Sequence, residues 1–283
     1  MASDSPIILL GERANVKPVR PQAAKRSAGR YTLVLITLLT AAFLYVPIIV
    51  LIVFSFNSAR SGAVWQGFTL NWYSRMFANE RIIEAAGISL LVAVLSTIGS
   101  VVVGTLMALA MERFVFKGKS FWDGLLYMPI IIPEIVAGIS LLLFYAAVGI
   151  ERGLFTLVVS HIAFSMPFVY LTVRARLADF DRSVEEAAQD LGANELVTFR
   201  RVTLPLLMPG VVSGALLAFT LSIDDFVISF FVNGKGWTTL PIYIWGQIRK
   251  GITPEINAIS ALMLVFSIGL VIVSQLIQRR QSS

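Results

Sequence analysis

Long runs of apolar residues constrain the fold of this chain more than any other feature. A transmembrane helix needs about 20 apolar residues to cross the hydrocarbon core of a bilayer. Runs of about this length lie at 31–56, 85–111, 121–149, 153–174, 205–232 and 256–277. Charged residues make up only 14% of the chain, against about a quarter in soluble domains. The sequence therefore predicts an all-α polytopic membrane protein with six transmembrane helices.

The distribution of Lys and Arg predicts the orientation of these helices. Six spans put both termini on one side, and if that side is the cytoplasm, 16 of the 23 Lys and Arg residues are cytoplasmic. Such a bias follows the positive-inside rule. We therefore expect a multi-pass protein with both termini cytoplasmic. Residues 1–30 would form a cytoplasmic N-terminal tail, and residues 31–278 would form a single transmembrane domain.

The composition excludes several classes of function. The absence of Cys excludes thiolate metal sites and cysteine nucleophiles. His161 is the only histidine, which excludes a histidine-based metal cluster. The chain also lacks the Gly-x-x-x-x-Gly-Lys-Ser/Thr sequence that cradles nucleotide phosphates. We predict no catalytic residue, no metal site and no cofactor in this chain, and the net charge of +6 is explained by basic cytoplasmic loops rather than by nucleic acid.

One polar segment between two apolar runs carries a spaced motif. It reads Glu-Ala-Ala at 186–188, then Gly192 after three intervening residues, and then, after nine more, Val202 and Leu204-Pro205. This pattern resembles the EAA loop of the membrane subunits of ABC importers, which docks on the ATPase subunit. The resemblance implies a coupling loop at about 181–205. It also implies that the ATPase contacts include Glu186, Ala187, Ala188, Gly192 and Leu196.

Local sequence signals predict the conformation of this loop. Ser183 with Glu186 forms a capping-box pattern that starts a helix. Gly192 is placed to end that helix in a left-handed conformation, and Asn194 can cap a second short helix. Leu204-Pro205 would open the next membrane span, because Pro is tolerated in a first helical turn. The alternative is a plain amphipathic interfacial helix between two spans.

The resemblance extends from Tyr31 to Gln278, where the chain is similar to the second, C-type permease of spermidine/putrescine ABC importers. Its most specific motifs are at 65–73, 218–226, 239–241 and 251–258. This implies a type I importer (MetI-like) permease fold in a bacterial inner membrane, and import of putrescine or spermidine. The implied partners are a second homologous permease, two ATPase subunits that bind ATP and Mg²⁺, a periplasmic polyamine-binding protein and the lipid bilayer.

Three acidic residues lie well inside the expected spans, away from their ends, namely Glu134, Asp224 and Asp225. A charge inside the membrane costs roughly 2.5–3.5 kcal/mol on insertion scales, so such residues usually face a bundle interior or a watery path. At about 1.5 Å per residue, Glu134 would lie roughly 20 Å and Asp224 roughly 28 Å from the inner ends of their helices. No Lys or Arg lies in the middle of a span to pair with them.

We therefore expect a substrate path with carboxylates that hold ammonium groups and aromatic rings that contact the methylenes. The expected path residues are Glu134, Asp224, Asp225, Phe219 and Tyr145, with Phe226 as a further candidate. Alternatively, Glu134 caps amides freed by Pro133. Asp224 and Asp225 would then contact the binding protein or the second permease.

Two further groups of residues interrupt the apolar spans. Pro129 and Pro133 predict a bend in the third helix, either as part of a gate or as a static kink. His161, Ser165 and Pro167 interrupt the fourth span, and a lone membrane histidine more often hydrogen-bonds a neighbouring helix than relays protons.

Other functions fit the chain less well. An ion-coupled secondary transporter would need no EAA loop and usually has repeated halves. An intramembrane aspartyl protease needs two facing carboxylates, for which Glu134 and Asp225 are the available pair.

The predicted orientation is testable by cysteine labelling, because the chain has no Cys. We expect Gly62→Cys to react with an impermeant thiol reagent added outside intact cells, and Asn194→Cys to react only after the cells are opened. The reverse pattern would overturn the orientation and place the motif on the wrong side for an ATPase.

Overall fold

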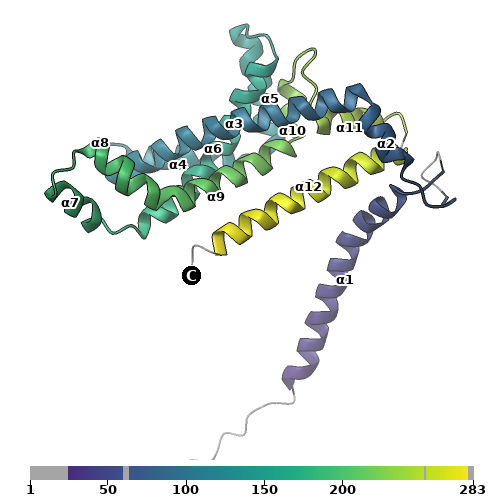
Figure 1. The fold of residues 1–283 in the computed structure, drawn as a ribbon, viewed down its shortest axis with the longest axis horizontal. Coiled ribbons are helices and arrows are strands. Elements are labelled where there is room, and N and C mark those ends of the chain that lie inside the picture. The colour runs from purple at the N-terminus through teal and green to yellow at the C-terminus, as the bar shows by residue number, and fades with distance from the viewer. Residues whose placement is uncertain (1–24, 60–63, 252, 280–283) are drawn as a thin grey trace, which may run out of the picture. The chain divides into compact units, whose positions relative to one another are not determined.

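The computed structural model describes residues 25–59, 64–251 and 253–279, so the labelling position Gly62 and most of the expected tail lie outside the described residues. The chain divides into two compact units, Met1–Val50 and Leu51–Ser283. The helices are α1 (Lys25–Phe54), α2 (Asn71–Ala78), α3 (Glu80–Arg113), α4 (Lys119–Ile131), α5 (Glu134–Val148), α6 (Leu154–Ala178), α7 (Ser183–Asp190), α8 (Glu195–Thr198), α9 (Leu204–Ile223), α10 (Val227–Val232), α11 (Leu240–Ile248) and α12 (Pro254–Arg279) (Figure 1).

The described helices confirm the all-α membrane fold class. Five of them are long and apolar enough to span a bilayer, and a bent pair, α4 with α5, would make a sixth span. The five apolar stretches run over Arg30–Phe54, Glu80–Arg113, Leu154–Ala178, Glu195–Ile223 and Pro254–Ile272. Helices suit this environment because each backbone N–H and C=O finds its partner within the segment.

The core of the second unit is a bundle of α3, α6 and α9, which lie side by side (Figure 1). Its buried side chains come from all three helices and include Ala108, Val169, Tyr170, Val173 and Leu207. The helix α6 runs through Pro167 without a break, so the polar interruption of the fourth span does not end the helix. The helix α12 packs on α9 and α2, and α10 packs on α5 and α6.

Glycines allow α6 to approach its two neighbours closely. A Cβ atom added at Gly104 of α3 would lie 2.9 Å from both the carbonyl oxygen of Met166 and the Cβ of Val169. On the other side, a Cβ at Gly214 of α9 would lie 3.1 Å from the Cα of Val169. Small residues at such contacts are the usual means by which membrane helices gain van der Waals packing.

The third predicted span is not one helix. The helices α4 and α5 meet at an angle of 107°. Ile132 is extended, with φ −69° and ψ 130°, because the ring of Pro133 disfavours a helical conformation in the residue before it. The bend at the prolines is confirmed, and it lies directly before Glu134, so the second half of the expected span, α5, does not continue the direction of α4.

The fifth predicted span is also interrupted. The helix α9 ends at Ile223, and α10 begins at Val227, so Asp224 and Asp225 lie at a break rather than inside a helix. A π-helical segment, Phe199–Thr203, precedes α9 and joins it to α8. The short helices α2 and α11 lie in stretches that were expected to be loops.

The packing at Gly104 predicts a position that cannot accept a larger side chain. Gly104→Val should destabilise the protein by about 1–3 kcal/mol, the cost of overpacking a close contact. Gly87→Val in the same helix is the matched control, because a Cβ there meets nothing within 4 Å. Thermal unfolding of the purified variants in detergent would measure both. Equal stability of the two variants would show that the α3–α6 contact is not tight.

Candidate functional site

The loop between α6 and α9 forms two short helices joined by a sharp turn. The N–H of Ser183 donates to the carboxylate of Asp181 at 2.9 Å, and this bond lowers the pKa of Asp181. Arg182 is the N-cap residue of α7. The expected capping box, with Ser183 as the N-cap residue and Glu186 three residues later, is therefore wrong, because Ser183 is already the first residue of the helix.

The turn after α7 is as expected. Gly192 has φ +89°, in the left-handed region that costs a glycine nothing. Its N–H donates to the carbonyl of Gln189 at 2.8 Å, and the N–H of Ala193 donates to that of Ala188 at 3.1 Å. These two bonds make the Schellman motif that ends many helices. The side chain of Asn194 then accepts from the N–H of Val197 at 2.9 Å and starts α8.

The tip of this loop exposes apolar side chains. Leu191 is 91% exposed and Leu196 is 74% exposed. Glu186, Ala187 and Gly192 are exposed as well, whereas Ala188 is half-buried. Large apolar side chains grouped on an exposed turn indicate a surface that another protein or the membrane interface covers. All five residues expected to contact an ATPase thus lie on or beside this surface.

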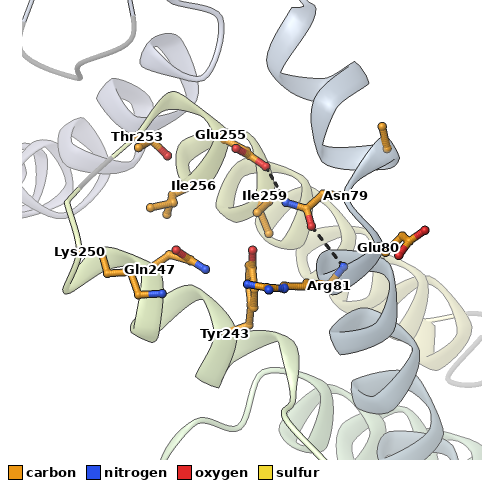
Figure 2. A pocket seen from close by; sticks show the side chains of 11 residues that line it. Asn79, Glu80, Arg81, Tyr243, Gln247, Lys250, Thr253, Glu255, Ile256 and Ile259 are labelled. Atoms are coloured by element: carbon orange, nitrogen blue, oxygen red, sulfur yellow. Dashed lines mark hydrogen bonds between the residues drawn. The ribbon is translucent and has the colours of Figure 1, made fainter. Parts of the chain in front are cut away.

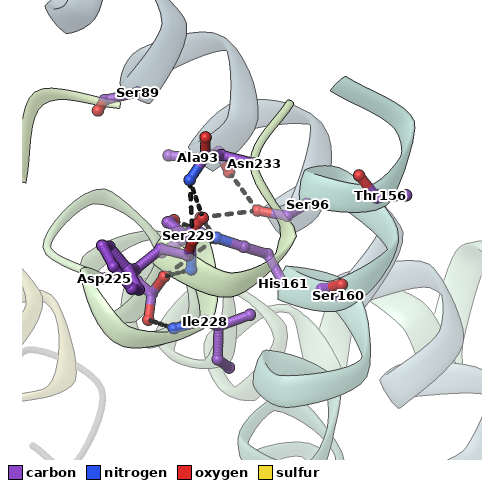
Figure 3. A network of polar contacts seen from close by, with 12 residues as sticks. Ser89, Ala93, Ser96, Thr156, Ser160, His161, Asp225, Ile228, Ser229 and Asn233 are labelled. Carbon is purple, nitrogen blue, oxygen red and sulfur yellow. Dashed lines mark hydrogen bonds and ion pairs between the residues drawn. The ribbon is translucent and has the colours of Figure 1, made fainter. Parts of the chain in front are cut away.

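The break between α9 and α10 is held by a buried polar network around Asp225 (Figure 3). The Asp225 carboxylate accepts from the N–H of Ser229 at 2.7 Å and from that of Ile228 at 3.2 Å. His161 Nε2 lies 3.3 Å from the same carboxylate and 2.9 Å from the hydroxyl of Ser229. Asp225 is 7% exposed, so it faces the interior of the bundle.

His161 links this network to the neighbouring helices. Its Nδ1 is 2.6 Å from the hydroxyl of Ser222, which is 2.9 Å from that of Ser96 on α3. The prediction that His161 hydrogen-bonds neighbouring helices is confirmed. The expectation that the acids lack partners is wrong for Asp225, because His161 and backbone amides freed at the break take the place of Lys or Arg.

The other expected path residues lie in different surroundings. Glu134 begins α5, is half-buried, and its carboxyl interacts with that of Asp225. Tyr145 is 2% exposed, and its hydroxyl is 2.9 Å from that of Ser160, so in this structure it belongs to the core rather than to an open surface. Phe219 is half-buried on α9.

Asp224 differs from its neighbour because its side chain is exposed. It accepts a hydrogen bond from the Ser267 hydroxyl at 2.8 Å. Asp224 lies on the wall of a groove of about 380 Å³ between the end of α9, α11 and α12. The groove also contains Phe226 and Trp245, whose ring centroids are 5.3 Å apart.

This groove has the chemistry of a site for an organic cation. A carboxylate supplies an ion pair, and aromatic faces attract ammonium groups and pack on alkyl chains. One of these rings already makes a cation–π contact, since the Arg249 guanidinium carbon lies 5.9 Å from the Trp245 ring centroid. Trp245 was not among the expected site residues, because the sequence predicts a loop where α11 forms.

A second, polar pocket lies where α2 meets α3, beside α11 and the start of α12 (Figure 2). Its volume is about 550 Å³. The side chains of Arg81 and Lys250 reach into it from different walls, and Asn79 donates to the Glu255 carboxylate at 3.1 Å. Since α3 begins at this pocket and ends beside the α7 loop, the two features lie at opposite ends of a helix of about 50 Å.

Comparison with known proteins gives consistent results. Residues 100–283 match the family described as "Binding-protein-dependent transport system inner membrane component". Over 238 residues, the chain is 47% identical to the spermidine/putrescine transport system permease protein PotC of Escherichia coli K12, covering 84% of this chain and 90% of PotC. It is 39% identical over 238 residues to the putrescine transport system permease protein PotI of the same organism, covering 82% and 85%.

A solved structure supports the same fold. The chain resembles one from a crystal structure of a bacterial ABC transporter involved in the import of the acidic polysaccharide alginate, with a TM-score of 0.68 and 19% identity. The match covers 89% of this chain and 97% of that chain.

Proposed function

The chain belongs to the family of binding-protein-dependent transport system inner membrane components, and we propose that it is the permease subunit of an ATP-driven importer of polyamines. Permeases of spermidine/putrescine and putrescine systems are its relatives at 47% and 39% identity. The observation that supports the substrate class is the groove whose lining includes the exposed Asp224 together with Phe226 and Trp245.

The groove suits a polyamine because a polyamine alternates ammonium groups with methylene segments. The Asp224 carboxylate would hold one ammonium group through a charge-assisted hydrogen bond. The indole of Trp245 and the ring of Phe226 would cover the adjoining methylenes and attract a second ammonium group. Glu134, at the start of α5, would add negative charge further along the path.

The loop at 181–205 would dock this chain on one of two ATPase subunits, which bind ATP and Mg²⁺. Its exposed leucines and alanines would enter a groove of that subunit, and Glu186 would supply a specific polar contact. A second permease would complete the path. With the loop in the cytoplasm of a bacterium and both termini on the same side, the pocket of Arg81 and Lys250 would face the periplasm, where a binding protein delivers the substrate.

The adjacent acids provide a matched pair of variants for the substrate proposal. In a reconstituted importer, we expect Asp224→Asn to weaken apparent polyamine affinity roughly tenfold to hundredfold, which corresponds to losing a charge-assisted hydrogen bond of about 1.5–3 kcal/mol. Its thermal stability should be unchanged because the side chain is exposed. We expect Asp225→Asn to lower the unfolding temperature instead, because this buried carboxylate holds two backbone amides and His161.

Uptake of labelled putrescine and spermidine, with thermal unfolding of the same preparations, measures both effects. Trp245→Ala should weaken uptake as Asp224→Asn does, whereas Trp245→Phe should retain most of it. Unchanged uptake by both Asp224→Asn and Trp245→Ala would rule out the groove as the cation site.

The docking proposal makes a separate prediction at Gly192. Gly192→Val should strain the left-handed turn by about 1–2 kcal/mol and reduce copurification of the ATPase subunit. A Cβ at Gly192 meets nothing within 4 Å in this chain, so a clash within the loop cannot explain a loss. Gly192→Asn is the control, because Asn adopts the left-handed conformation more readily. Equal loss in both variants would show that the side chain, and not the turn, disturbs docking.

A further inference from the structure

Glu185 is the acidic residue of α7 whose side chain is turned toward the rest of the protein. Its neighbour Glu186 is exposed, but the side chain of Glu185 is only 14% exposed. The Glu185 carboxylate accepts hydrogen bonds from the Arg113 guanidinium and from the Thr203 hydroxyl, and both donors bond the same oxygen, Oε1. Arg113 Nη2 is also 3.5 Å from the Thr203 hydroxyl, which closes a three-residue cluster.

The two partners of Glu185 lie at the ends of two core helices. Arg113 is the last residue of α3, where a cation also interacts favourably with the helix dipole. Thr203 is fully buried and is the residue immediately before α9. One carboxylate on α7 therefore joins the loop to both helices that pack against α6.

Few other side-chain bonds join this part of the loop to α3. Among the hydrogen bonds of the described residues, the second is from the Arg182 guanidinium to the carbonyl of Glu112, at 3.3 Å. That bond involves a long side chain and a backbone acceptor at an exposed position. The Glu185 cluster is less exposed and combines charge with defined geometry, which makes its hydrogen bonds the stronger ones.

We infer that Glu185 is the positioning residue that transmits displacement of α7 to α3 and α9. The inference rests on the proposed docking of the α7 tip on an ATPase subunit. A docked tip moves with the partner, and a carboxylate shared between two helix ends moves both together. Motion of packed helices as rigid bodies is a common form of such transitions. An exposed contact of leucines at the tip would secure docking but would not by itself fix α7 to the membrane helices.

The experiment uses the complete importer in proteoliposomes, with its ATPase subunits and binding protein. We expect Glu185→Ala to copurify with the ATPase subunit and to keep basal ATP hydrolysis. Polyamine import per ATP hydrolysed should fall roughly tenfold, and stimulation of hydrolysis by the loaded binding protein should be lost. Asp179→Asn, at an exposed position between α6 and the docking loop, is the matched control and should behave as wild type.

A charge exchange separates transmission from a general structural role. Glu185→Arg and Arg113→Glu should each uncouple transport from hydrolysis, whereas the double variant should recover a substantial part of the coupling. Thr203→Val, which removes the hydroxyl donor but keeps the shape, should give an intermediate loss. Recovery in the double variant requires direct contact between the two side chains, which independent damage at two positions would not produce.

Three outcomes would overturn the inference. They are normal coupling in Glu185→Ala, loss of ATPase copurification in that variant, and no recovery in the double variant. The first would show that the cluster transmits nothing, the second that Glu185 belongs to the docking surface, and the third that the pair is not the connection. If the wild-type complex itself neither binds an ATPase subunit nor imports polyamines, the proposed function fails, and this result is distinct from all three.

Discussion

The close packing of α6 between α3 and α9 is the constraint on which the rest of the second unit depends. Without water in the hydrocarbon core, the helices gain little from the hydrophobic effect and associate through close contact. Gly104 and Gly214 bring two backbones against the same turn of α6, around Val169. The shorter helices, the breaks and the loop at 181–205 are all positioned relative to this bundle.

A bundle of this kind tolerates a broken helix only where the freed backbone groups find partners. At the end of α9, the Asp225 carboxylate accepts the amides of Ile228 and Ser229, and His161 adds a donor from α6. This explains why a buried acid is present at that depth. The break also gives two adjacent aspartates different surroundings, because Asp225 points into the core whereas Asp224 lies on the wall of a groove.

The sequence predicted those structural features that a short stretch of chain determines by itself. Apolar runs located the spanning helices, Gly192 and Asn194 predicted the turn of the loop, and Pro133 indicated a bend. The 107° angle at that bend depends on contacts of α5 with α10, far along the chain, and could not be obtained from Pro133 alone. No Pro or Gly marks the break at 224–226, so the apolar pattern concealed it.

Sites built from distant segments were the least predictable. Asp224 was identified as an intramembrane acid, but its aromatic partner Trp245 belongs to a short helix that periodicity did not reveal. Arg113 and Glu185 are 72 residues apart, and each alone resembles an ordinary charge on a solvated loop. Such pairs follow from the arrangement of the helices, so they become visible only when α3, α7 and α9 are placed together.

The helix α9 connects the two candidate sites directly. Thr203, bonded to Glu185, immediately precedes its first residue, and Asp224 follows its last residue. At about 1.5 Å per residue, the helix between them is roughly 30 Å long. It packs against α3 and α6, and α12 packs on it. Because α11 packs in turn on α3 and α12, the wall of the groove that carries Trp245 is held by the same helices as Asp224. Under the proposed coupling, a displacement of the loop at 181–205 would therefore reach both walls of the proposed cation groove through α9 and α3.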